Sequence, residues 1–337
     1  MVGEVEIGAR RVPLSPFISE EARQALMAPP LKLLDRDSQP ALDDIEGWRD
    51  YISRDNAVMQ ALEQQALPML DVSIERTRLN GTRVAWVRPN TPSPAFAGKI
   101  LMNIHGGGFI LGEGSVFEAA VVAHLGGVDV LAVDYRVPPE HRYPASLEDS
   151  LAAYQALLAS HGASNIAVFG TSAGGTLAVT TILKARDLGL SLPAAAGICT
   201  PLIELSDRWG YAGDTAITND GLDVLSGVFA GEEGSGGGFL ALFRGGASPT
   251  DPLLSPIYAD FSKGFCPSFL LSGTRDMLLS STVLTHRAIH RAGAPTELHV
   301  FESMQHGFHL NIQLPEAREA LHDMLRFFKG HLGIATG

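Results

Sequence analysis

Short apolar runs recur at regular intervals along the chain from residue 72 onward. Runs of this length, bounded by Gly, Pro, Asn or Asp, are typical of β-strands. The predicted strands are Val72–Leu79, Thr82–Arg88, Lys99–Ile104, Val128–Val133, Asn165–Phe169, Ala194–Cys199, Pro267–Leu271 and Thr296–Phe301. Between or after these runs the apolar spacing changes to that of a helix. The predicted helices are Val116–Leu125, Ala145–Ser160, Ser172–Leu188, Leu278–Ala292 and Pro315–Phe328.

The order of these elements predicts an α/β fold. Strands that alternate with helices form a mostly parallel sheet with helices on both faces, here a sheet of eight strands. The first two strands are joined by Asn80-Gly81, which is typical of a two-residue hairpin. We therefore expect an antiparallel pair at the start of the sheet.

Two stretches interrupt the alternation. Residues 1–65 show only helix and loop character, with helical spacing over Glu20–Met27 and Gly47–Leu67. Residues 205–248 have helical character without a strand. We expect both to form a helical cap above the C-terminal edge of the sheet, where ligands bind in such folds. The core domain would then consist of residues 66–204 and 249–337.

The composition excludes several classes of function. A net charge of −12 without a cluster of Lys and Arg argues against a nucleic-acid partner. The segment Met1–Arg11 has neither a basic leader nor an apolar run, and polar residues interrupt the longest apolar stretch, Ala119–Val133. We therefore expect no membrane span and a cytoplasmic protein. Cys199 and Cys266 lie in apolar runs, which indicates buried free thiols.

A candidate nucleophile lies where the strand ending near Phe169 meets the next helix. The segment Gly170-Thr171-Ser172-Ala173-Gly174 has the pattern G-x-S-x-G. Between a strand and a helix this pattern forms a sharp turn that exposes the Ser hydroxyl, while the glycines allow close backbone approach. An ordinary strand-helix turn that happens to contain Ser is the alternative. The strand before and the helix after favour a nucleophilic Ser172.

Three consecutive glycines follow the strand Lys99–Ile104, in His105-Gly106-Gly107-Gly108-Phe109. Such a run is costly in chain entropy and suits a loop whose bare backbone approaches a ligand. Acyl transfer requires amides directed at the developing oxyanion. We therefore predict an oxyanion hole formed by the amides of Gly107, Gly108 and Ala173, and we expect His105 to brace the loop by hydrogen bonding. A flexible turn is the alternative.

In combination these motifs resemble those of the hormone-sensitive-lipase-like esterases, bacterial family IV of the α/β-hydrolases. The resemblance covers residues 70 to 330 and includes 135–141 (YRVPPEH) and 251–256 (DPLLSP). It implies the α/β-hydrolase fold with a helical cap, and Thr171 places the chain in the group with G-T-S-A-G. The resemblance also implies a structural role for Arg136 and Glu140, which we expect to form an ion pair that supports the oxyanion loop. Many members show D-x-L-x-D near the triad acid, whereas this chain has Ser280 at the last position.

The general base should be a histidine on a loop at the C-terminal edge of the sheet. His306 directly follows the last predicted strand and precedes Gly307, and the resulting H-G-F matches the family motif. His309 is the alternative, although we expect it to be a packing residue. The remaining histidines after Ser172 fall in predicted helices, in a strand or in the tail: His286, His290, His299, His322 and His331.

The triad acid should lie at the end of a strand between the nucleophile and the base. Asp276 closes the run that follows the strand Pro267–Leu271, and the order Ser-Asp-His is that of α/β-hydrolases. Glu204 also follows a strand and is the main rival, and Glu302 is a second one. An Asp at this place can also be a simple helix cap. We predict Asp276 as the acid.

These residues predict a carboxylic ester hydrolase that forms an acyl-enzyme on Ser172 and needs neither a metal nor an organic cofactor. Amide or formamide hydrolysis by the same triad is the first alternative. The second is a non-catalytic ligand-binding module like the plant gibberellin receptors, which resemble this family but lack the triad histidine. His306 favours an enzyme.

The resemblance also implies finer properties. Small caps of this type suggest an ester substrate with a short acyl chain of roughly two to eight carbons. Analogy predicts a homodimer that pairs through the edge strand Thr296–Phe301. Aromatic residues of the cap could line an acyl pocket or form the core of the cap, and these are Trp209, Tyr211, Phe229, Phe239 and Phe243.

Overall fold

The computed structural model describes residues 11–29, 31–205, 214–219, 222–225 and 238–335. Eight strands form one sheet in the order β1-β2-β4-β3-β5-β6-β7-β8. The strands are β1 (Val72–Leu79), β2 (Thr82–Pro89), β3 (Ile100–Ile104), β4 (Val130–Asp134), β5 (Ile166–Thr171), β6 (Ala195–Cys199), β7 (Ser268–Gly273) and β8 (Thr296–Phe301). The predicted sheet is therefore confirmed, and each strand lies within a few residues of its predicted range.

The antiparallel part of the sheet is confined to its beginning. β1 pairs with β2 and β2 pairs with β4 in antiparallel register, whereas all later pairs are parallel. Asn80 and Gly81 both have positive φ, 48° and 85°, as a type I′ hairpin turn requires. The predicted hairpin is thus confirmed, and β8 lies at the opposite edge of the sheet.

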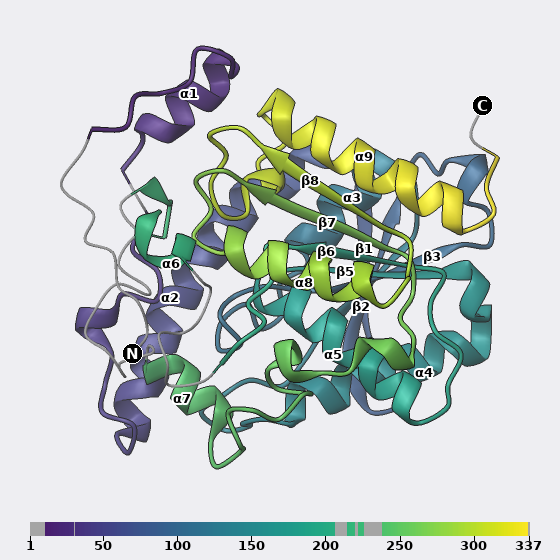
Figure 1. Ribbon diagram of the computed structural model, residues 1–337, viewed down its shortest axis with the longest axis horizontal. Helices are drawn as coiled ribbons and strands as arrows, with labels where there is room; N and C mark the ends of the chain where they lie inside the picture. The colour runs from purple at the N-terminus through teal and green to yellow at the C-terminus, as the bar shows by residue number, and fades with distance from the viewer. Residues whose placement is uncertain (1–10, 30, 206–213, 220–221, 226–237, 336–337) are drawn as a thin grey trace.

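Helices cover both faces of the sheet (Figure 1). α3 and α9 contact each other on one face, while α4, α5 and α8 cover the other. These core helices are α3 (Phe117–Gly126), α4 (Ala145–His161), α5 (Ala173–Asp187), α8 (Leu279–Arg291) and α9 (Pro315–His331). Among the described helices, none combines the length and the apolar character needed to cross a lipid bilayer.

The alternation of side chains along the central strands explains why both faces need a cover. In β5, Ile166 and Val168 belong to the cluster that contains α4 and α5 residues. Ala167 and Phe169, which point the opposite way, belong to the cluster with α3 and α9 residues. All four are fully buried. A strand that is apolar on both faces is stable only between two layers of helices.

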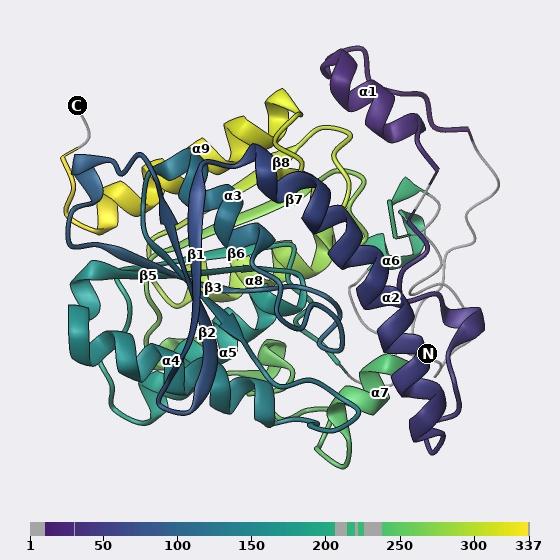
Figure 2. The same ribbon diagram turned by 180° about the vertical axis from the view of Figure 1, so that it is seen from behind.

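The remaining helices gather at one end of the sheet in both views (Figure 1 and Figure 2). They are α1 (Glu20–Met27), α2 (Ile45–Ala66), α6 (Asp214–Thr218) and α7 (Gly238–Arg244). α2 buries one stripe of side chains that includes Trp48 and Asp55, and its opposite side is exposed. These helices lie in the two stretches for which a helical cap is expected, and this group of helices is called the cap below.

α2 also fastens the core loop that follows β3. The Asn56 side chain accepts a hydrogen bond from the Gly112 amide at 2.8 Å. The Glu63 carboxylate accepts bonds from the Ser115 hydroxyl at 2.7 Å and from the Val116 amide at 3.1 Å. Glu63 therefore caps the first turn of α3, where backbone amides lack partners within the helix and a negative charge is favourable.

Gly174 in the first turn of α5 lies so close to the end of β3 that no side chain fits. A Cβ atom built there would be 1.9 Å from the Ile104 carbonyl oxygen. We expect Gly174→Ala to lower the free energy of unfolding by more than about 3 kcal/mol, because backbone must move on both sides of the contact. Urea unfolding followed by circular dichroism measures this change.

Gly330→Ala is the matched control for that measurement, because a Cβ at Gly330 in α9 would meet no atom within 4 Å. Alanine in this helix should stabilise the protein by about 0.5 to 1 kcal/mol. Equal stability of the two variants would contradict the steric account of Gly174.

Candidate active site

Ser172 lies in a sharp turn between β5 and α5. Its backbone has φ 59° and ψ −122°, a conformation that residues with a side chain rarely adopt. The turn is held by a hydrogen bond of 2.9 Å from the Ser172 amide to the Cys199 carbonyl of the neighbouring strand β6. This strained conformation presents the Ser172 hydroxyl at the C-terminal edge of the sheet, as in a nucleophile elbow.

The glycine-rich loop after β3 runs alongside this turn. Gly107 and Gly108 have positive φ, 109° and 60°, and a Cβ on Gly107 would be 2.5 Å from the Leu111 carbonyl oxygen. Within the described ranges, no residue accepts a hydrogen bond from the amides of Gly107, Gly108 or Ala173. The three backbone donors of the predicted oxyanion hole are therefore available to a ligand.

His105 contacts this loop through its ring and its backbone. Its Nδ1 lies 2.7 Å from the Gly106 carbonyl, and its ring stacks on Tyr135 at 4.1 Å between centroids. The Tyr135 hydroxyl donates to the His105 carbonyl at 3.0 Å. Burial lowers the pKa of the His105 imidazole, so the ring is neutral at physiological pH. These contacts suit a bracing role.

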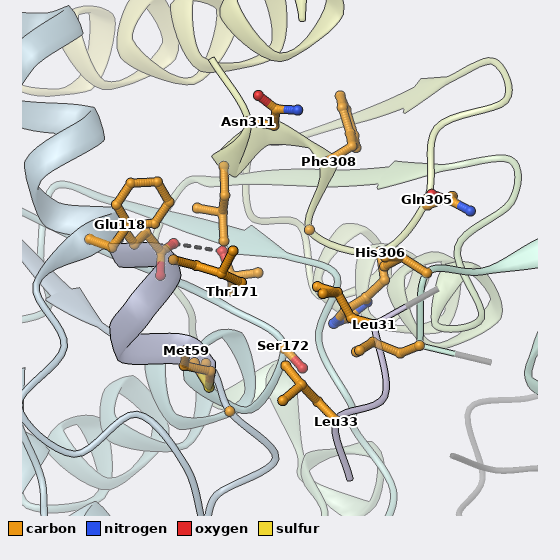
Figure 3. Close-up of a pocket in the computed structure, with 18 of the residues that line it drawn as sticks. Leu31, Leu33, Met59, Glu118, Thr171, Ser172, Gln305, His306, Phe308 and Asn311 are labelled. Carbon is orange, nitrogen blue, oxygen red and sulfur yellow. Dashed lines mark hydrogen bonds between the residues drawn. The ribbon is translucent and has the colours of Figure 1, made fainter. Parts of the chain in front are cut away.

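His306 and Asp276 meet at the C-terminal edge of the sheet. Asp276 follows β7 and His306 follows β8, and Nδ1 of the imidazole lies 3.0 Å from Oδ1 of the carboxylate. The Asp276 carboxylate is fully buried and also accepts bonds from the Ser272 hydroxyl at 2.6 Å and the Leu278 amide at 2.9 Å. In Figure 3 the His306 imidazole points toward the Ser172 hydroxyl.

The pKa of His306 results from two opposing effects. Burial alone would lower this pKa, but the charge and hydrogen bond of Asp276, together with the charge of Asp223, raise it above its ordinary value. Because Asp276 accepts from Nδ1, the other nitrogen, Nε2, remains to receive a proton from a hydroxyl. The pair can therefore act as an oriented general base.

The rival residues have other partners. Glu204 accepts a bond from the Tyr258 hydroxyl at 3.1 Å, and Glu302 accepts one from Thr274 at 3.2 Å. His299 lies in β8 and pairs with Glu297 and Asp323, each at 3.1 Å. His309 lies beside Thr171, with 2.8 Å between its Nε2 and the Thr171 hydroxyl. The hydrogen bonds of these four residues are therefore separate from the one between Asp276 and His306.

The expected ion pair between Arg136 and Glu140 is wrong. Arg136 follows β4 and points at the first turns of α4, where it binds Asp149 at 2.9 Å and Glu148 at 3.2 Å. Glu140 faces the cap instead, and its carboxylate lies 2.8 Å from the guanidinium of Arg49 in α2. The family resemblance suggested the pair, whereas the two side chains point to different helices, α4 for Arg136 and α2 for Glu140.

A buried polar network beneath the nucleophile was not predicted. The Thr171 hydroxyl donates to the Glu118 carboxylate at 2.6 Å (Figure 3). The same hydroxyl also contacts His309, and all three residues are buried. Burial raises the pKa of Glu118 to about 7 and lowers that of His309 to about 3. A single acidic residue inside the apolar run of α3 was the signal in the sequence that could have indicated this network.

A cavity of about 980 Å³ opens above Ser172 and His306. Its volume is at the upper end of the range for small-molecule sites. The cap supplies much of the wall, including Leu31, Leu33, Met59 and Phe239. Phe243 instead stacks on Phe109 of the glycine-rich loop and belongs to a buried cluster that continues into the sheet. The other three aromatic candidates, Trp209, Tyr211 and Phe229, lie outside the described residues.

Comparisons with known proteins identify the family of this chain. Residues 101–310 match the family model described as alpha/beta hydrolase fold. The chain is 32% identical to an acetyl-hydrolase of Streptomyces hygroscopicus over 70% of its own length and 76% of that protein. It is 30% identical to the putative acetyl-hydrolase LipR of Mycobacterium tuberculosis over 78% of its own length and 82% of that protein.

Solved structures show the same relationship. The crystal structure of an esterase matches with a TM-score of 0.89 and 31% identity, covering 99% of both chains. An esterase of the bacterial hormone-sensitive lipase family matches with a TM-score of 0.74 and 27% identity, covering 94% of this chain and 99% of that one. The chain therefore belongs to the alpha/beta hydrolase fold family. Within it, the chain is a hormone-sensitive-lipase-like esterase of bacterial family IV, as its motifs predicted.

The raised pKa of Glu118 predicts a pH-dependent stability. Its pKa is about 7 in the folded protein and 4.5 ordinarily, so its stabilising contribution is complete below about pH 4.5 and is lost as pH rises through 7. Glu118→Gln keeps an acceptor for Thr171 without a charge. We expect this variant to gain about 1 to 3 kcal/mol over the wild type at pH 8 and little at pH 5.

Thermal unfolding at the two pH values measures this difference. Glu319→Gln, at an exposed position of α9, is the control and should change stability equally at both pH values. A gain for Glu118→Gln that is the same at pH 5 and pH 8 would contradict the shifted titration.

Proposed function

We propose that the chain hydrolyses carboxylic esters of short acyl chains through a triad of Ser172, His306 and Asp276. The hydrogen bond between His306 and Asp276, at the edge of the cavity that Ser172 also lines, carries this proposal. It joins a buried carboxylate to an imidazole with a raised pKa, and Ser172, held in a strained turn, lines the same cavity as that imidazole. The family relationship supports ester hydrolysis as the reaction.

In the first half of the reaction, Nε2 of His306 takes the proton from the Ser172 hydroxyl as Oγ attacks the carbonyl carbon of the ester. Asp276 accepts from Nδ1–H, orients the ring and stabilises the imidazolium without taking the proton itself. His306 then gives the proton to the leaving alkoxide. The alcohol leaves, and the acyl group remains on Ser172 as an ester.

Both tetrahedral intermediates carry a negative charge on the former carbonyl oxygen. The free amides of Gly107, Gly108 and Ala173 are the donors that we assign to this oxygen, and the first turn of α5 adds its positive dipole end. Removal of one such donor in other enzymes costs about 100- to 1000-fold in rate. In the second half, His306 activates a water molecule that releases the acid from Ser172.

The substrate class follows from the relatives and the cavity. The Streptomyces hygroscopicus relative is named an acetyl-hydrolase, so its acyl group has two carbons. The cavity of this chain is large and mostly apolar in its side chains, with Leu31 and Leu33 close to Ser172. A short acyl chain would leave room there for an apolar alcohol. Amide or formamide hydrolysis needs the same residues and remains the second candidate reaction.

We expect Ser172→Ala to lower kcat/KM for p-nitrophenyl acetate by at least about 1000-fold, because the nucleophile is lost. Asp276→Asn should lower it by roughly 1000- to 10,000-fold, because the imidazole loses its partner at Nδ1. Stopped-flow or steady-state hydrolysis assays measure both values. Glu204→Gln, a change in the rival acid, is the control and should stay within about tenfold of the wild type.

Titration with an organophosphate gives an independent check on the nucleophile. The wild type should lose its activity with one phosphonyl group on Ser172, as intact-protein mass spectrometry would show. Retained turnover in Ser172→Ala, or a Glu204 variant as inactive as the Asp276 variant, would contradict the proposed triad.

A series of p-nitrophenyl esters tests the acyl specificity. Each added methylene that finds an apolar wall contributes about 0.8 kcal/mol, so kcat/KM should rise by about fourfold per carbon at first. We expect it to fall beyond about eight carbons. A maximum with long chains would contradict the short-chain proposal. Matched p-nitroanilides should react far more slowly, and equal rates would favour the amidase alternative.

A further inference from the structure

Polar side chains of the inserted cap segment contact the loop that carries the triad acid. Thr215 of α6 and Ser280 exchange two hydrogen bonds, at 3.2 Å and 2.9 Å. The Asn219 side chain donates to the carbonyls of Thr274 and Asp276, at 3.1 Å and 3.0 Å. Ser280, where related sequences carry a second acid, thus forms a neutral contact with the cap. The cap is therefore hydrogen-bonded directly to the backbone of the loop that contains Asp276.

Asp223 is the charged member of this contact. One oxygen of its carboxylate, Oδ2, accepts from the Met277 amide at 2.8 Å and from the His306 amide at 3.3 Å. The other oxygen accepts from the Leu225 amide at 3.2 Å. Asp223 is only 3% exposed and lines the cavity above Ser172. One cap carboxylate therefore joins the loop of the triad acid to the loop of the triad base.

We propose that Asp223 is a positioning residue that fixes the His306 backbone and places a second negative charge beside the imidazole. The cap thereby sets the pH at which His306 becomes an effective base. This inference rests on the proposed function, because it assumes that His306 accepts the proton of Ser172. A residue that only closed the cavity would need neither a charge nor a bond to the His306 amide.

Charged or titratable groups face both the His306 imidazole and the Asp223 carboxylate. His306 faces Asp276 on the loop after β7, Asp223 on the cap and His309 in the short helix Phe308–Leu310. Burial lowers the pKa of His309 to about 3, so His309 is neutral in the working range. Asp223 faces His306 and Asp276. Among the residues that the structure describes, Asp276 and Asp223 are therefore the charges that stabilise the imidazolium.

Asp223 changes its charge in the pH range in which His306 must accept a proton. Burial raises its pKa to about 6, with the His306 charge acting against this shift and the Asp276 charge adding to it. Above this pH Asp223 is an anion and favours protonated His306. Removal of its charge should therefore lower the pKa of His306, because the imidazolium loses one of its two favourable partners.

The test is the pH profile of kcat/KM in full-length Asp223→Asn with p-nitrophenyl acetate. The single amide oxygen of Asn can still accept from the Met277 and His306 amides but carries no charge, and the bond from the Leu225 amide is lost. We expect the acidic limb, which reports the free base, to move to lower pH by about 0.5 to 1 unit. Asp223→Glu keeps the charge and should keep the limb within about 0.2 unit of the wild type.

Thr215→Val is the matched control, because it loosens the same cap segment without a change in charge. The acidic limb of its kcat/KM profile should coincide with that of the wild type, even if its KM for the ester rises. Should Asp223→Asn fail to fold, Asp223→Ser removes the same charge with a smaller side chain. NMR titration of the His306 ring in the wild type and in the folded variant gives a second measure of the shift.

Two results would overturn the proposal. The first is an acidic limb that does not move in Asp223→Asn or Asp223→Ser. Asp223 would then only hold the cap in place. The second is an equal shift in Thr215→Val, which would assign the effect to cap opening rather than to charge. Ser172→Ala distinguishes failure of the Asp223 proposal from failure of the proposed function. If that variant has no turnover, the proposed function holds whatever the result for Asp223.

Discussion

The site depends on one backbone contact, the close approach of the turn at Ser172 to the end of β3. Gly170 and Gly174 lie on either side of the nucleophile, and a Cβ on either would be 2.4 Å or less from the Ile104 carbonyl oxygen. The loop that follows Ile104 carries the free amides of Gly107 and Gly108. Because the two glycines allow this close approach, the amides proposed as oxyanion donors and the proposed nucleophile, Ser172, line the same cavity. Packing of the sheet therefore sets the geometry of the chemistry.

Two buried histidines near this contact differ in pKa because their hydrogen-bond partners differ. His306 and His309 are three residues apart, and burial disfavours the charged form of both. Only His306 has a carboxylate in hydrogen-bond contact with its ring, and its pKa is raised. The partner of His309 is the neutral hydroxyl of Thr171, and its pKa falls to about 3. The first ring can take up a proton in the working range, and the second is a neutral structural group.

The strands, the core helices and the residues around Ser172 could be predicted because their signals are local. Apolar runs mark the strands, and glycines mark the turns that need positive φ or close approach. Contacts between segments far apart in the chain could not be predicted in this way. Glu140 binds Arg49 of the cap rather than Arg136, and Asp223 reaches the His306 amide across 83 residues. Such contacts depend on how the cap lies on the core, and periodicity contains no information about that.

The hydrogen bonds from α2 to the core couple the wall of the cavity to the position of the glycine-rich loop. Asn56 and Glu63 hold the segment that leads from the glycine-rich loop into α3. α2, which lines the cavity, is thus also part of the scaffold that holds the glycine-rich loop. A recombinant chimera that took its first 65 residues from a relative would exchange specificity and loop support together. Cavity-lining residues of α2 that make none of these hydrogen bonds, such as Met59, are free of that constraint and are the better places to alter substrate choice.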